Sequence, residues 1–136
     1  MKVRLSSIEI LGFIGLFICI LTYVVRHMGV IDNTKLNIFW FAPNFGGAWF
    51  TTALVKQFFK PCGTTKPFLP LGFSIKIYML VCFAVIVLAV LNELVYPLNT
   101  SGAFDPIDVI ATIIAQIIAF IVPITIKDNC LTNYTK

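Results

Sequence analysis

Charged residues are scarce in this sequence. Only 12% of its 136 residues are Asp, Glu, Lys or Arg, whereas 59% are hydrophobic, and the mean hydropathy is +0.95. A soluble domain carries roughly a quarter charged residues, so this composition excludes an ordinary soluble fold. No polar stretch is long enough to form a separate soluble domain. The sequence therefore predicts one transmembrane domain over residues 1–136, with the lipid bilayer as its main partner.

Residues that carry chemistry are also few. The chain has one histidine and four cysteines, and the cysteines do not have the spacing of a zinc site. We find no nucleophile with a neighbouring base, no metal-ligand set and no phosphate-binding loop. We therefore predict no catalytic residues, no metal and no cofactor, and we disfavour an enzyme without excluding it. The net charge of +4 is spread between apolar runs, which disfavours nucleic-acid binding.

Four apolar runs approach the length that crosses a bilayer. A hydrocarbon core about 30 Å thick needs roughly 20 helical residues, and the runs cover about 8–25, 43–59, 75–96 and 106–126. The first run follows basic residues as a signal peptide would, but it ends without a small-residue cleavage site, which favours a retained helix. The predicted fold class is all-α, an integral membrane bundle of four transmembrane helices.

The basic residues indicate the orientation of this bundle. With four crossings, eight basic residues lie on the side of the two termini and two lie on the opposite side. Cytoplasmic segments carry the excess of Lys and Arg, so the prediction is N-in/C-in. We interpret four of these residues as anchors to anionic lipid headgroups, namely Lys56, Lys60, Lys66 and Lys76. The larger set is Lys2, Arg4, Lys56, Lys60, Lys66, Lys76, Lys127 and Lys136, and the smaller set is Arg26 and Lys35.

The second run contains an irregular stretch, Pro43-Asn44-Phe45-Gly46-Gly47. Pro43 either starts this helix, where its missing N–H costs nothing, or kinks a longer helix that begins earlier. Gly46 and Gly47 are predicted to let a neighbouring helix approach closely. The alternative is that an opened backbone beside Asn44 lines a polar cavity.

Other polar residues in the runs have local interpretations. Glu9, near the start of the first run, suits the positive end of a helix, and a pairing with Arg4 is equally compatible with the sequence. Gln116, in the middle of the fourth run, is predicted to form an interhelical hydrogen bond. A coupling-site role for Gln116 is the alternative.

Three carboxylates stand out: Glu93 near the end of the third run, and Asp105 and Asp108 around the start of the fourth. The predicted helix directions place all three at the outer leaflet, together with Arg26 and Asn44. Ionisable residues in membrane spans are expensive and often functional, so these five are the candidate ligand-binding residues. The alternatives are that Asp105 and Asp108 only cap the fourth helix and that Glu93 extends to the interface.

The segment Asn92-Glu93-Leu94-Val95-Tyr96, with Phe104-Asp105-Pro106-Ile107-Asp108 after it, resembles the VanZ-like family of small bacterial membrane proteins. The family shows a glutamate at the end of one span, then a Phe-Asp pair and a second aspartate three positions later. The glutamine and arginine common in the family are missing here. The resemblance implies a multispan protein of the bacterial inner membrane, linked in some members to glycopeptide resistance, without a settled biochemical activity.

Two functions remain open from the sequence. The first is a small envelope protein whose outer acidic site binds a cationic or polar group on a lipid-linked or cell-wall ligand. The second is a structural or effector subunit that forms a homo-oligomer or joins a larger membrane complex, with Gly46 and Gly47 at the contact.

Overall fold

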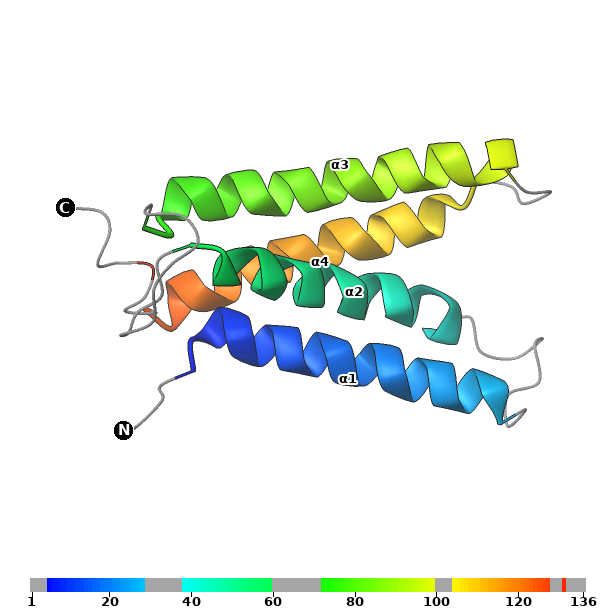
Figure 1. The fold of residues 1–136 in the computed structure, drawn as a ribbon, viewed down its shortest axis with the longest axis horizontal. Helices are drawn as coiled ribbons and strands as arrows, with labels where there is room; N and C mark the ends of the chain where they lie inside the picture. Colours follow the sequence, from blue (N-terminus) through cyan, green and yellow to red (C-terminus); the bar gives the residue numbers. More distant parts are fainter. Residues whose placement is uncertain (1–4, 29–37, 60–71, 100–103, 128–130, 132–136) are drawn as a thin grey trace.

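The chain folds into long helices in a computed structural model that describes residues 5–28, 38–59, 72–99, 104–127 and 131; at 38–40 and 96–99 it describes the backbone alone. The secondary-structure elements are all helices: α1 (Ser7–His27), α2 (Ile38–Gln57), α3 (Ile75–Asn99) and α4 (Pro106–Thr125) (Figure 1). The all-α prediction is confirmed. Each helix overlaps one of the four predicted runs.

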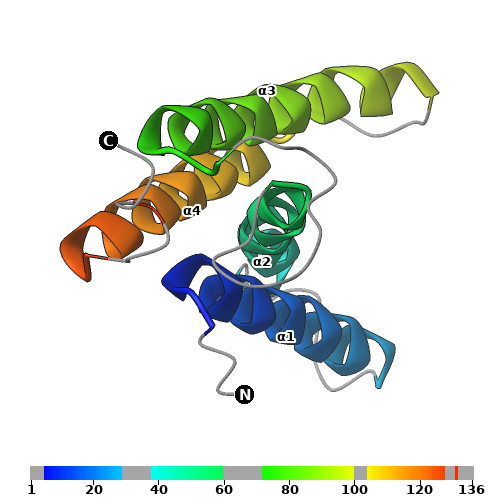
Figure 2. The same ribbon diagram turned by 60° about the vertical axis from the view of Figure 1, so that its left-hand side comes forward.

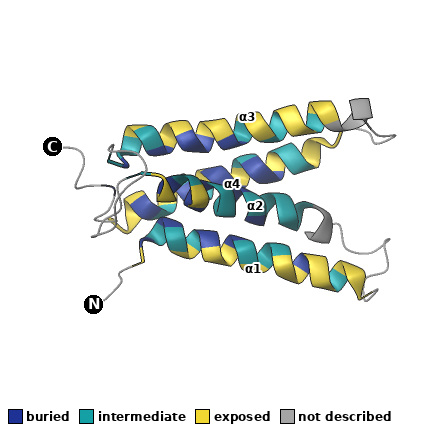
Figure 3. Ribbon diagram, in the orientation of Figure 1, coloured by how far each residue is buried: buried dark blue, intermediate teal, exposed yellow. Residues whose placement is uncertain are grey.

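Three of these helices are long and apolar enough to cross a membrane within the described residues. They are α1, α3 over Ile75–Val95, and α4. Large hydrophobic side chains such as Phe13, Phe17 and Leu80 are exposed, and yellow bands of exposed residues recur along these helices in Figure 3. Apolar outer faces of this extent suit lipid rather than water as the surrounding solvent.

Consecutive helices run antiparallel, and α2 occupies the middle of the bundle. It packs closely against α1 on one side and against α4 on the other, while α3 packs mainly against α4. Figure 2 shows α2 between α1 and the α3–α4 pair. Most described side chains of α2 are buried or half-buried by these neighbours, whereas Leu54 near its end remains exposed.

Glycines allow α1 and α2 to approach closely. A Cβ atom on Gly12 would collide with the side chain of Ala53, and one on Gly15 would collide with the carbonyl oxygen of Gly46. A Cβ on Gly46 would in turn lie 2.5 Å from the carbonyl oxygen of Gly15. Small residues bring membrane helices together in this way. Gly46 is thus at a helix contact, but a Cβ on Gly47 would meet nothing within 4 Å.

Pro43 lies inside α2, which begins at Ile38. Of the two alternatives for this residue, the structure therefore has the longer helix that begins before it. The helix thus begins five residues before the predicted second run, 43–59, and includes the aromatic residues that precede Pro43. Proline lacks an N–H, and the central packing of α2 stabilises the helix in spite of that loss.

A polar network joins α2 to α4 in the interior. The side-chain amide of Gln116 donates to the carbonyl oxygen of Ala48 and to the Thr52 hydroxyl, both at 3.0 Å. The Trp49 indole N–H donates to the carbonyl oxygen of Ala115 at 2.7 Å. Gln116 is 1% exposed, and its interhelical role is as predicted. None of the buried side-chain nitrogen or oxygen atoms of the described residues lacks a hydrogen-bond partner.

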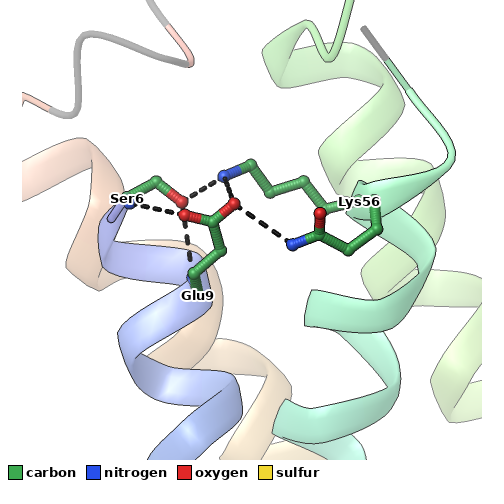
Figure 4. Close-up of polar contacts among 4 residues, drawn as sticks. Ser6, Glu9 and Lys56 are labelled. Carbon is green, nitrogen blue, oxygen red and sulfur yellow. Dashed lines mark hydrogen bonds and ion pairs between the residues drawn. The ribbon is translucent and has the colours of Figure 1, made fainter. Parts of the chain in front are cut away.

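A second polar cluster joins the start of α1 to the end of α2. Ser6 caps α1 and forms a capping box with Glu9, whose Oε2 accepts from the Ser6 N–H at 2.8 Å. Lys56 of α2 extends to both residues (Figure 4). Its Nζ lies 3.2 Å from Glu9 Oε1, and Gln57 Nε2 donates to the same oxygen at 3.2 Å. Lys56 is 8% exposed, so the interpretation as a lipid-headgroup anchor is wrong for this residue.

Candidate ligand site at the acidic end of the bundle

Antiparallel packing brings the predicted site residues to one end of the bundle. Glu93 lies in the last turns of α3, Asp105 and Asp108 open α4, Arg26 lies at the end of α1, and Asn44 lies in the second turn of α2. This is the right-hand end of Figure 1. We call it the acidic end.

Asp105 and Glu93 stabilise the junction between α3 and α4. Asp105 has extended backbone angles and is the N-cap of α4, with its Oδ1 accepting from the N–H of Ile107 at 2.9 Å. The next residue, Pro106, occupies the first helical position, where a missing N–H costs nothing. The N–H of Asp105 donates to Glu93 Oε2 at 3.3 Å. Capping therefore accounts for part of the role of both carboxylates.

Asp108 makes a different set of contacts. Its carboxylate accepts a hydrogen bond from the side chain of Asn44 on α2, and it lies within reach of the charges of Asp105, Glu93 and Arg26. Asp108 is half-buried and lies in the first turn of α4. Asp108 therefore interacts with α2 as well as lying at the start of its own helix.

An open cavity of about 250 Å³ lies near Asp108 and is lined by residues of α2, α3 and α4. Asn44, the partner of the Asp108 carboxylate, is one of its lining residues. Thr112, one helical turn after Asp108, is another. The Thr112 hydroxyl donates to the backbone carbonyl of Asp108 at 3.1 Å. The remaining lining residues are Pro43, Gly47, Ala48, Thr51, Val85, Leu88 and Ala89.

The cavity was not predicted from the sequence, apart from the alternative that the stretch at Asn44 lines a polar space. Gly47 borders the cavity, which explains the open space around it. Thr51 and Thr112 gave no distinct signal because threonine in an apolar run also suits ordinary helix packing. Their helical spacing from Asn44 and Asp108 is the one signal that could have identified them.

The arrangement can attract and hold a cationic group. Three carboxylates lie near one another and near a single guanidinium, although none of them lines the cavity, so the local charge is negative, and apolar surroundings strengthen electrostatic attraction. A second hollow of about 120 Å³ lies between α1 and α2. The one carboxylate in its wall, Glu9, already binds Lys56 and Gln57. No group of three or more His, Cys, Asp or Glu residues in the described part of the chain could hold a metal ion.

Comparison with known proteins gives no family assignment. No family model matches the chain, no curated protein matches it and no solved structure matches it. The resemblance to the VanZ-like family stays a prediction that rests on the residues quoted for it.

Proposed function

We propose that the protein is a four-span bundle of the bacterial inner membrane with both termini in the cytoplasm. The 20 residues of α2 correspond to about 30 Å of helix at 1.5 Å per residue, which is the thickness of the hydrocarbon core. The helix lies alongside three neighbours that are long enough to span. The excess of basic residues on the side of the termini supports the direction.

In this orientation the acidic end faces outward, and its function is to bind a ligand that carries a cationic group. The ligand belongs to the lipid-linked or cell-wall compounds of the envelope. The observation that carries this proposal is the placement of Asp108, hydrogen-bonded by Asn44 beside a cavity and within reach of Glu93, Asp105 and Arg26. If Asp108 only stabilised the start of α4, it would not need Asn44 of α2 as a partner.

The test measures binding of a cell-wall peptide that contains lysine to the purified full-length chain in nanodiscs. Asp108→Asn keeps the size of the side chain and one acceptor oxygen, and it removes the charge. We expect the dissociation constant to rise about tenfold, which corresponds to roughly 1.4 kcal/mol. The matched control is the same peptide with its amino groups acetylated, including the lysine ε-amino group, so that it carries no ammonium charge. It should bind both proteins weakly.

Glu93→Gln is the second variant, and it should weaken binding in the same direction. Thermal unfolding of each variant shows whether the bundle is intact. Equal affinity of the wild-type protein for the free and the acetylated peptide, or unchanged affinity in a folded Asp108→Asn protein, would contradict the proposal.

The other predicted function, an oligomerising subunit, gains no specific support from the contacts. Gly46, one of the two glycines assigned to that contact, is covered by Gly15 of the same chain. Gly47 lines the cavity. Gly46 is therefore already used within the chain, and we retain ligand binding as the proposed function.

A further inference from the structure

The cavity near Asp108 is open rather than closed, and its lining combines buried residues with an exposed one on α3. Its floor is buried, with Ala48, Val85 and Thr112 between 4% and 8% exposed, whereas Leu88 at its edge is 59% exposed. In a membrane-spanning bundle, the exposed face of α3 contacts lipid. A ligand can therefore enter this cavity from within the bilayer as well as from the acidic end.

The lining changes in polarity along α2. Asn44 lies next to the carboxylate of Asp108, Gly47 and Ala48 follow one turn later, and Thr51 lies seven residues after Asn44. Seven helical residues correspond to about 10 Å. Polar atoms thus extend from the acidic end about one third of the way into a 30 Å hydrocarbon core, and the walls between them are apolar. The cavity therefore combines polar groups with apolar walls, as the headgroup and ester region of a lipid molecule does.

We propose that the cavity takes a phospholipid with a primary ammonium headgroup, phosphatidylethanolamine, which enters laterally from the leaflet at the acidic end. The ammonium group binds at Asp108 and Glu93, and Arg26 supplies a positive charge near the phosphate. The ester oxygens face Asn44 and Thr112. This inference rests on the proposed function and adds the class of the ligand and its path of entry.

The size of the cavity fits part of a lipid rather than a whole one. Sites that enclose a drug-sized ligand measure about 300–1,000 Å³, and this one measures about 250 Å³. The headgroup and the first carbons occupy the cavity, and the rest of each chain remains in the bilayer beside Leu88. Charge complementarity selects the headgroup: net negative charge at the site attracts ammonium and repels the anionic headgroup of phosphatidylglycerol.

The test uses native mass spectrometry of the full chain in detergent with equimolar phosphatidylethanolamine and phosphatidylglycerol of identical chains. Gly47→Leu and Ala89→Leu fill the cavity from opposite walls, and Gly47 has room for a side chain. Ala84→Leu is the matched control, because Ala84 is exposed on α3 and does not line the cavity. Asp108→Asn tests the headgroup contact.

We expect the wild-type and Ala84→Leu proteins to retain phosphatidylethanolamine about tenfold more than phosphatidylglycerol, a difference of roughly 1.4 kcal/mol. Both cavity-filling variants should lose the bound lipid. Asp108→Asn should keep a bound lipid but show nearly equal retention of the two headgroups. Unchanged lipid retention in both cavity-filling variants, while they remain folded, overturns the inference.

The cell-wall peptide separates this inference from the proposed function. If peptide binding depends on Asp108 and lipid retention does not change in any variant, the acidic site stands and lipid entry is wrong. If neither the peptide nor the lipid responds to Asp108→Asn, both proposals fail.

Discussion

At the scale of single residues, neighbours in the sequence have opposite surroundings. Gly46 lies against the backbone of α1, and Gly47 borders an open cavity. The aspartates of α4 differ in the same way. Asp105 caps the helix, whereas Asp108 is bound by Asn44. Each difference arises because a helix turns about 100° per residue, so adjacent or nearby side chains face different neighbours.

This contrast predicts different effects of the same substitution at the two glycines. Gly46→Ala should destabilise the bundle by about 1–3 kcal/mol, because α1 must move away to admit the methyl group. Gly47→Ala should be neutral or should stabilise by up to about 1 kcal/mol, because alanine is the better helix former and its Cβ meets nothing. Unfolding of the purified protein in mixed micelles with increasing SDS measures both. Equal destabilisation by the two variants would contradict the close α1–α2 contact.

At the scale of elements, polar contacts fix the position of α2 against its two main neighbours. The Gln116 network binds it to α4, and the Ser6–Glu9–Lys56 cluster binds it to α1. Apolar packing alone gives membrane helices little preference for one partner over lipid. These hydrogen bonds therefore determine which faces of α2 meet α1 and α4.

A double-mutant cycle can measure the α2–α4 contact. Gln116→Leu and Thr52→Val each remove one side of the hydrogen bond between these residues while keeping similar volumes. Interhelical hydrogen bonds in membranes are worth about 0.6–1.7 kcal/mol, so we expect a coupling energy in that range. Gln116→Leu paired with Thr125→Val is the control cycle, because the Thr125 hydroxyl bonds within its own helix. Purely additive effects of Thr52→Val and Gln116→Leu would show that the bond does not contribute.

The α1–α2 ion pair predicts an asymmetry between its two partners. Glu9→Gln should destabilise by roughly 3 kcal/mol, since it leaves Lys56 buried without its counter-ion. Lys56→Met should cost less, because the Glu9 carboxylate keeps the Ser6 N–H and the Gln57 amide as donors.

The double variant Glu9→Gln/Lys56→Met should recover most of the stability lost in Glu9→Gln, since no buried charge remains. SDS unfolding at constant pH measures all three proteins. A double variant as unstable as the sum of the two single variants would argue against the ion pair.

At the scale of the whole molecule, the proposed number of crossings depends on α2. If α2 spans the bilayer with the other three helices, both termini lie on the same side. If α2 does not span, three crossings place them on opposite sides. The orientation of the acidic end also follows from this count.

Reporter fusions distinguish these topologies. Green fluorescent protein fused after Lys136 should fluoresce, and alkaline phosphatase fused there should be inactive, because the end lies in the cytoplasm. Alkaline phosphatase fused after Ser101 should be active, because that point follows an odd number of crossings. Green fluorescent protein at the N-terminus provides the control for the first helix. An active phosphatase at Lys136 together with a fluorescent N-terminal fusion would indicate three crossings.

Much of the fold follows from the sequence alone. The apolar runs near α1, α3 and α4 predicted these helices because a bilayer requires about 20 apolar residues and internal backbone hydrogen bonding. The start of α4 was also predicted well, since Asp105 and Pro106 act through local backbone geometry. Helix direction alone placed Glu93, Asp108 and Asn44 at one end.

The tertiary structure decided the rest, because the remaining features depend on which faces of distant helices meet. It placed Pro43 inside α2, where packing on two sides offsets a local rule against proline. It paired Lys56 with Glu9, 47 positions away in the chain, instead of with lipid. It also left space beside Gly47 and Asn44, and no local pattern in the sequence records where three helices fail to fill the volume between them.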